Sequence, residues 1–125
     1  MVIGILQFEL IVHGSESLKD KRRVVNSVKD RLHREHLVSV AEVAGHDLLN
    51  AAVMGLACVG TDGARVGEVL DHITEKLRGL GDAELGSVSR QIVSAADLAA
   101  SGEHGGIDES ALADEMLRHF DKGNR

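Results

Sequence analysis

The residues best suited to chemistry lie in one basic segment, residues 17–36. This segment contains seven of the 14 lysines and arginines and three acidic residues, so it carries +4 while the rest of the chain carries −10. Helical spacing places five of its polar side chains on one stripe: Lys19, Arg22, Asn26, Lys29 and His33. Such a row suits contact with phosphate groups, and we predict that it binds an anion or RNA. A solvated helix face without a ligand is the alternative that the residues leave open.

One lysine of the segment, Lys21, falls among the apolar positions of the helix instead of on this stripe. A lysine in that position must either extend to an edge or meet an acid. Glu42, in the strand expected to follow, is a suitable partner. We therefore predict a structural ion pair between Lys21 and Glu42, and no catalytic role for either residue.

Metal and cofactor chemistry find little support among the remaining residues. The chain has seven histidines, and His33 and His36 are spaced so that they could share a metal, but no third ligand lies near them in the sequence. The chain also lacks a glycine-rich phosphate loop, a nucleophile elbow and a Ser-x-x-Lys motif. We expect no metal site, no cofactor and no enzymatic activity.

The elements that must position these residues alternate between strands and helices. Strands are predicted at residues 2–12, 37–43, 50–60 and 85–93, and helices at 17–36 and from 61 or 62 to 79. The order β-α-β-β-α-β is that of the ferredoxin-like split βαβ, an α+β fold with a four-stranded antiparallel sheet and two helices on one face. We expect residues 1–93 to form this domain, 94–106 a linker and 107–125 an amphipathic C-terminal helix.

Two activities associated with this fold can be tested on the sequence. An acylphosphatase would need an arginine in the turn at residues 13–16, and that turn has none, although Asn50 begins the third strand. RNA recognition on the sheet would need aromatic side chains for base stacking, and the chain has 2 Phe, 0 Trp and 0 Tyr. Any RNA must therefore meet the first helix instead of the sheet.

The sheet face away from the helices is expected to be apolar. Its side chains on the two central strands include Ile3, Ile5, Ile11, Val53, Ala57 and Val59. Soluble monomers seldom expose such a patch. We predict that a homodimer forms through this face, with the C-terminal helix as the other element that could cover it.

The single cysteine and the first dozen residues indicate in which cellular compartment the protein is expected. Cys58 lies in an apolar run, so we expect a buried, inert thiol and no disulfide. The apolar N-terminal stretch is interrupted by Gln7 and Glu9 and is too short to span a bilayer. We expect a soluble cytoplasmic protein without membrane contact.

Three stretches of this sequence resemble the YlxP-like family of small bacterial proteins. They are V-I-G-I-L at residues 2–6, S-L-K-D-K-R-R at 17–23 and V-S-V-A-E-V at 38–43. The resemblance covers residues 1–93 and implies a ferredoxin-like fold with no established activity. Its members are often encoded near translation and ribosome-maturation factors, which implies ribosomal RNA or a ribosomal particle as partner. The chain departs from relatives at Asp47-Leu48-Leu49-Asn50, where they tend to carry Asp-Leu-Trp-Gln.

Two hypotheses about function follow from these features. The first is a non-enzymatic accessory factor that contacts phosphate on the ribosome or on RNA through the first helix. The second is a small-molecule-binding regulatory module that acts at a dimer interface, which rests on analogy with other ferredoxin-like domains.

Overall fold

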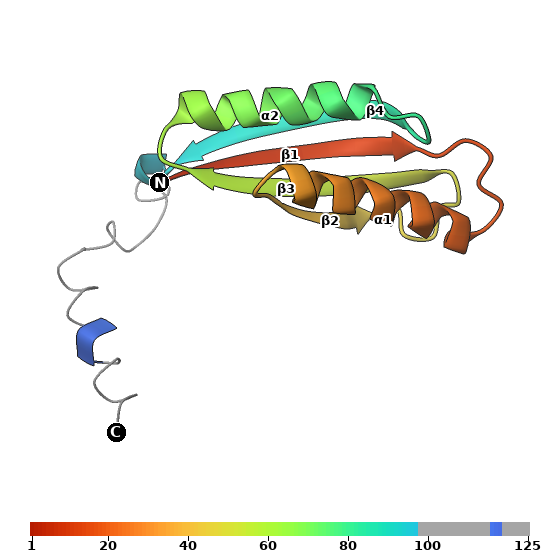
Figure 1. The fold of residues 1–125 in the computed structure, drawn as a ribbon, viewed down its shortest axis with the longest axis horizontal. Coiled ribbons are helices and arrows are strands. Elements are labelled where there is room, and N and C mark those ends of the chain that lie inside the picture. Colours follow the sequence, from red (N-terminus) through yellow and green to blue (C-terminus); the bar gives the residue numbers. More distant parts are fainter. Residues whose placement is uncertain (98–115, 119–125) are drawn as a thin grey trace. The chain divides into compact units, whose positions relative to one another are not determined.

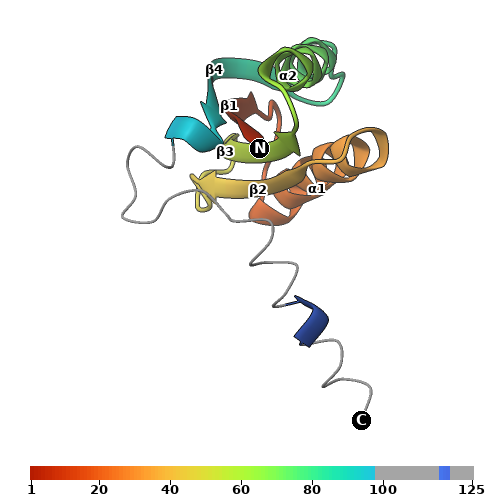
Figure 2. The same cartoon turned by 90° about the vertical axis from the view of Figure 1, so that its left-hand side faces the viewer.

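The computed structural model describes residues 1–97 and 116–118. Its first compact unit, Met1–Ser94, contains all the elements named here. In chain order they are β1 (Val2–Ile11), α1 (Leu18–Glu35), β2 (Ser39–Ala44), β3 (Ala51–Gly60), α2 (Gly63–Arg78) and β4 (Glu84–Ser94). The strands form one antiparallel sheet in the order β2-β3-β1-β4. Both helices lie on the same face of it (Figures 1 and 2), which confirms the predicted ferredoxin-like α+β fold.

The core lies between this sheet and the two helices. Alternate residues of β1 point toward the helices because successive side chains of a strand face opposite sides, and Leu6, Phe8 and Leu10 are buried there. Their β3 neighbours follow the same alternation, so the Cys58 thiol is buried as predicted. From the helices the core receives Val25, Val28, Leu32, Val66, Leu70, Ile73 and Leu77.

Helix α1 begins and ends where its capping residues dictate. The Ser17 hydroxyl accepts a hydrogen bond from the Asp20 backbone N–H at 3.1 Å, and the Asp20 carboxylate accepts one from the Glu16 N–H at 3.3 Å. At the other end His36 is extended, and its N–H still bonds to the Leu32 carbonyl. The helix is therefore fixed at both ends, which also fixes the direction of every side chain between them.

Helix α2 approaches β1 closely because β1 carries a glycine beneath it. A Cβ at Gly4 would lie 2.5 Å from Val66 Cγ1 and 3.0 Å from the Cys58 sulfur. The helix itself is capped by Asp62, whose carboxylate accepts a hydrogen bond from the Arg65 N–H at 2.9 Å.

The structure corrects two boundaries expected from the sequence. Strand β2 begins at Ser39 and not at residue 37, since the chain leaves the cap of α1 with the Leu37 side chain 99% exposed. Ser94 was expected to open a linker but belongs to β4, where it pairs with Val2. Residues 95–97 and 116–118 are helical, and the rest of the predicted linker and C-terminal helix lies outside the described residues.

No helix in the part of the chain that the structure describes combines the length and the apolar character needed to cross a bilayer.

Candidate anion-binding surface

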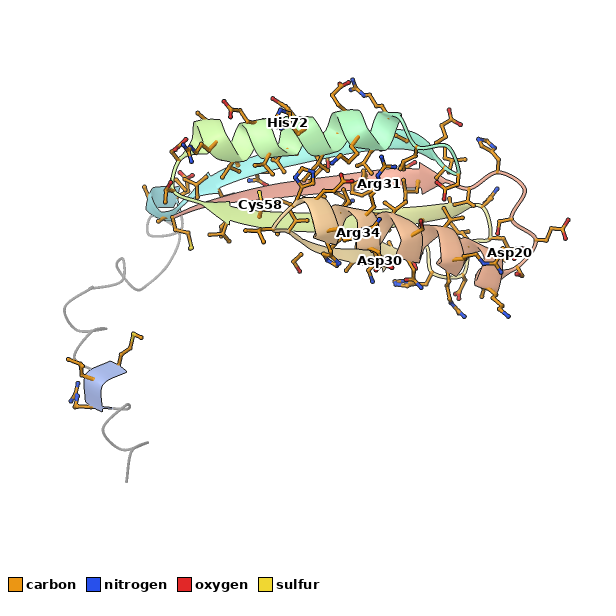
Figure 3. The ribbon with its side chains drawn as sticks, viewed as in Figure 1. Asp20, Asp30, Arg31, Arg34, Cys58 and His72 are labelled. Carbon is orange, nitrogen blue, oxygen red and sulfur yellow. The ribbon has the colours of Figure 1, made fainter. Side chains whose placement is uncertain are left out.

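The basic stripe, defined as Lys19, Arg22, Asn26, Lys29 and His33, lies on the side of α1 that faces away from α2. On the side toward α2, the Glu35 carboxylate pairs with Lys76 of α2 and lies 3.7 Å from Arg31. Figure 3 shows Arg31 on the side of α1 toward α2, the upper side in this view, and Asp30 on the opposite side. The stripe is centred about 160° round the helix from Arg31. Four of its side chains are exposed, and that of Lys29 is half-buried.

The cations of the stripe have no carboxylate partner among the described residues. Ion pairs in that part of the chain involve His13, Lys21, Arg31, Lys76, Arg78 and Arg90. Within residues 1–97 and 116–118, no acidic side chain neutralises the charges of Lys19, Arg22 and Lys29. An anion that approaches this side of α1 would displace no ion pair of the described structure.

Two further arginines extend this surface beyond the residues that the spacing indicated. Arg34 follows Asp30 by four residues, yet no ion pair joins them in the described structure, where Arg23 is also unpaired. The Asp20 carboxylate, which could have met Arg23, accepts a backbone hydrogen bond at the start of α1. The sequence could have indicated that Arg23 is unpaired. Asp20 is three residues after Ser17, so its carboxylate is expected to cap the helix and is not available to Arg23.

Lys21 does not belong to this surface, because its side chain is 1% exposed. Its Nζ donates hydrogen bonds to the carbonyls of Gly45 at 2.9 Å, His46 at 3.2 Å and Ala51 at 3.3 Å. The same atom lies 3.1 Å from Oε2 of Glu42, which accepts no hydrogen bond. Three carbonyls thus use the three protons of the ammonium, and Glu42 contributes charge. The pair is structural and ties the β2–β3 connection to α1.

The histidines do not assemble a metal site in the part of the chain that the structure describes. No group of three His, Cys, Asp or Glu side chains there is placed to hold an ion. His36 Nε2 lies 3.1 Å from Lys76 Nζ, His13 Nε2 lies 2.8 Å from the Glu84 carboxylate, and His46 Nε2 lies 3.1 Å from the Glu42 carbonyl. These three rings therefore take part in local hydrogen bonds, while His33 of the stripe is exposed.

Cavities at the two ends of the sheet are the other candidate sites. One of about 540 Å³ lies between the β1–α1 turn and residues 81–84, and Arg23, Asp20 and Glu84 line it. The other, about 440 Å³, has the Cys58 thiol, His36 and Arg65 in its lining. Each lining holds side chains of catalytic types, but no described hydrogen bond joins a nucleophile to a base. His36 Nε2 meets Lys76 Nζ and not the Cys58 thiol, and the Ser15 hydroxyl in the first cavity donates to the Ser17 carbonyl. The α1 surface is therefore the stronger candidate.

The residues expected at a dimer interface lie together on the sheet face opposite the helices. The antiparallel pairing of β1 with β3 sets Ile3 opposite Val59 and Ile5 opposite Ala57. It also places Ile11 and Val53 on the same face of the sheet as these residues. The structure thus brings the predicted set to one surface.

Comparison with known proteins gives a family without an assigned activity. The family described as "Protein of unknown function (DUF503)" matches residues 3–90. No curated protein matches the chain. Among solved structures, a de novo designed protein with a ferredoxin fold, determined by solution NMR, aligns with 87% of this chain and 96% of its own length. Its identity to this chain is 11% and the TM-score is 0.37, which carries no argument about function.

Proposed function

Because this chain belongs to DUF503, a family of proteins of unknown function, we propose a function from its own surfaces. The protein is a cytoplasmic, non-enzymatic accessory factor that binds ribosomal RNA, free or in a ribosomal particle. It does so through phosphate contacts made by the exposed side of α1.

The unpaired cations of the basic stripe are the observation that carries this proposal. The chain has a net charge of −6, so general attraction to polyanions is not expected. Lys19, Arg22 and Lys29 lie on one side of one helix, without carboxylate partners in the described structure. Concentrating free positive charge on one element of an acidic protein directs an anion to that element.

The dimensions of the stripe fit a nucleic-acid backbone. From Lys19 to His33 the helix rises about 21 Å at 1.5 Å per residue. Phosphates of one strand of a nucleic-acid duplex follow each other at roughly 3 Å along its axis, about 3.4 Å in DNA. A helix lying beside the backbone could therefore meet several phosphates, and such contacts carry no sequence information. The resemblance to YlxP-like proteins supports ribosomal RNA over other polyanions.

The experiment is a binding measurement with two matched double variants. Arg22→Glu with Lys29→Glu reverses two charges of the stripe, and Arg65→Glu with Arg78→Glu makes the same charge change on α2. Both sets are at exposed or half-buried positions outside the core. Affinity for ribosomal subunits or a ribosomal RNA fragment should fall at least tenfold in the first variant and less than twofold in the second. Equal losses in the two variants, or no binding by the unaltered protein at low salt, would refute the proposal.

The second hypothesis, a small-molecule-binding regulatory module, has one observation in its favour. An apolar groove of about 430 Å³ lies on the sheet face opposite the helices, lined by Ile5, Ala41, Val43 and Gly55. Screening a metabolite panel by thermal shift distinguishes the hypotheses, since a ligand of the folded state raises the melting temperature. Ribosome binding that resists reversal of the stripe, together with such a shift, would favour this alternative.

A further inference from the structure

The sheet face opposite the helices, which we name the open face, is apolar along its central strands except at Gln7 and Glu9 of β1. Its apolar side chains are Ile3, Ile5 and Ile11 on β1, Val53, Ala57 and Val59 on β3, and Ala41 and Val43 on β2. Val59 is 68% exposed, Val43 50% and Ile5 41%. Both helices lie on the other face (Figure 2), so within Met1–Ser94 no helix covers this one.

The open face has relief as well as apolar character. Gly55 and Ala57 on β3, with Ala41 on β2, leave a groove of about 430 Å³. Val43 closes part of it, since a Cβ at Gly55 would lie 3.1 Å from Val43 Cγ1. Beside the groove, β1 carries the larger side chains Ile3 and Ile5. A ridge on β1 therefore runs next to a groove on β3, and the two strands are neighbours at the centre of the sheet.

We propose that the open face binds a second copy of this chain and forms a two-fold symmetric dimer. The two-fold axis runs parallel to the strands, between the two facing sheets and above the line between β1 and β3. It places β1 of each copy on β3 of the other. Each isoleucine ridge then enters the groove of its partner, and the same contact occurs twice, as an isologous interface requires. Packing two sheets with nearly aligned strands is an ordinary arrangement for apolar faces.

The size of the face suits a stable dimer. With a rise of about 3.3 Å per residue and about 4.8 Å between strands, the four strands cover roughly 600 Å². Side-chain relief increases the accessible area beyond this flat value. A standard protein interface buries about 800 Å² on each partner, so the face is close to the area that a specific dimer needs.

The charges on the open face favour a second copy over a nucleic acid or an anionic membrane. Among the described strands, Arg90 points to the helix side, where it pairs with Asp71, and no lysine or arginine lies on the open side. The acids there lie away from the groove. A Cβ at Gly86 of β4 would be 3.2 Å from the Glu9 carboxylate, and Glu84 pairs with His13 at the strand end. Glu9 lies on β1 opposite Val53, outside the lining of the groove, and its carboxylate lies toward β4.

The test is the mass of the full-length protein in solution, measured by sedimentation equilibrium from about 1 to 100 μM. The unaltered protein should have twice the chain mass of 13.3 kDa. Ile5→Glu places a carboxylate on each side of the interface and should weaken association at least 100-fold, which gives the single-chain mass. Ser27→Glu adds the same charge to the exposed surface of α1 and should leave the dimer intact. Far-UV circular dichroism shows whether each variant is folded.

Val59→Glu provides a second variant if Ile5→Glu fails to fold, because Val59 is the more exposed of the two. A single-chain mass for the unaltered protein at 100 μM would overturn the proposal, whatever else covers the face. A dimer that survives folded Ile5→Glu and Val59→Glu would overturn it as well, since the copies would then meet elsewhere. Neither result depends on RNA binding by α1.

Discussion

Nζ of Lys21 lies 3.1 Å from Oε2 of Glu42, while the same ammonium donates its hydrogen bonds to three backbone carbonyls. The side chains of the two residues are 1% and 15% exposed. A charge this deeply buried is tolerated only when hydrogen bonds and an opposite charge compensate its desolvation. Lys21 therefore links α1, which carries the basic stripe, to the connection between β2 and β3.

Removing the ammonium should be costly. Lys21→Met keeps the length of the side chain but leaves three carbonyls and the Glu42 carboxylate without their partner. We expect the free energy of unfolding to fall by about 3–5 kcal/mol, the usual cost of breaking a buried pair. Urea denaturation measures it. Lys19→Met on the exposed side of α1 is the control and should change it by less than about 0.5 kcal/mol. A similarly small change for Lys21→Met would show that the pair is dispensable.

Gly4 should resist substitution because α2 passes directly above it. A methyl group there would meet Val66, Cys58 and Leu70 side chains, the nearest at 2.5 Å. We expect Gly4→Ala to cost about 1–3 kcal/mol of unfolding free energy, in the range of other overpacked cores. At Gly81 a Cβ would meet no atom within 4 Å, so Gly81→Ala should stay within about 1 kcal/mol. Equal effects at the two glycines would contradict the close approach of α2 to β1.

The thiol of Cys58 should react only when the domain opens. It is 6% exposed and is the one cysteine of the chain, so total thiol labelling reports on it alone. We expect labelling by a water-soluble disulfide reagent to be at least ~1,000-fold slower in buffer than in denaturant, as global protection of a stable domain requires. A Ser27→Cys variant supplies an exposed thiol for comparison. Fast labelling of Cys58 in the folded protein would mean that the β3–α2 layer opens easily.

Much of the fold could be predicted from the sequence because local patterns dictate it. Apolar residues at helical spacing mark the buried side of α1, and alternation in β1 separates Leu6 from Ile5. Leu37 shows where this reasoning fails. It opens an apolar run that is typical of a strand, yet it is fully exposed because the chain must first leave the cap of α1.

The candidate site was predictable only in part. Helical geometry places the basic stripe on one side of α1, but it does not show which cations lack partners. Arg31 pairs with Glu35 as the spacing suggests, whereas Arg34 does not pair with Asp30 in the described structure. The carbonyls that Lys21 binds lie 24 to 30 residues away in the sequence, so the pattern could indicate Glu42 but not these acceptors. The bulges in β2 and β4 likewise depend on strand pairing across the sheet.

The salt dependence of RNA binding tests the central claim most directly. Each phosphate contact made by a cation contributes roughly −0.7 to −0.9 to the slope of log K against log salt concentration. With Lys19, Arg22 and Lys29 in contact, the slope measured on a ribosomal RNA fragment should be about −2 to −3. Arg22→Glu with Lys29→Glu leaves only Lys19 in contact and should reduce the slope to about −1 or smaller in magnitude, while Arg65→Glu with Arg78→Glu leaves it unchanged. A slope near zero for the unaltered protein, or one that the stripe variant shares with it, would contradict RNA binding through α1.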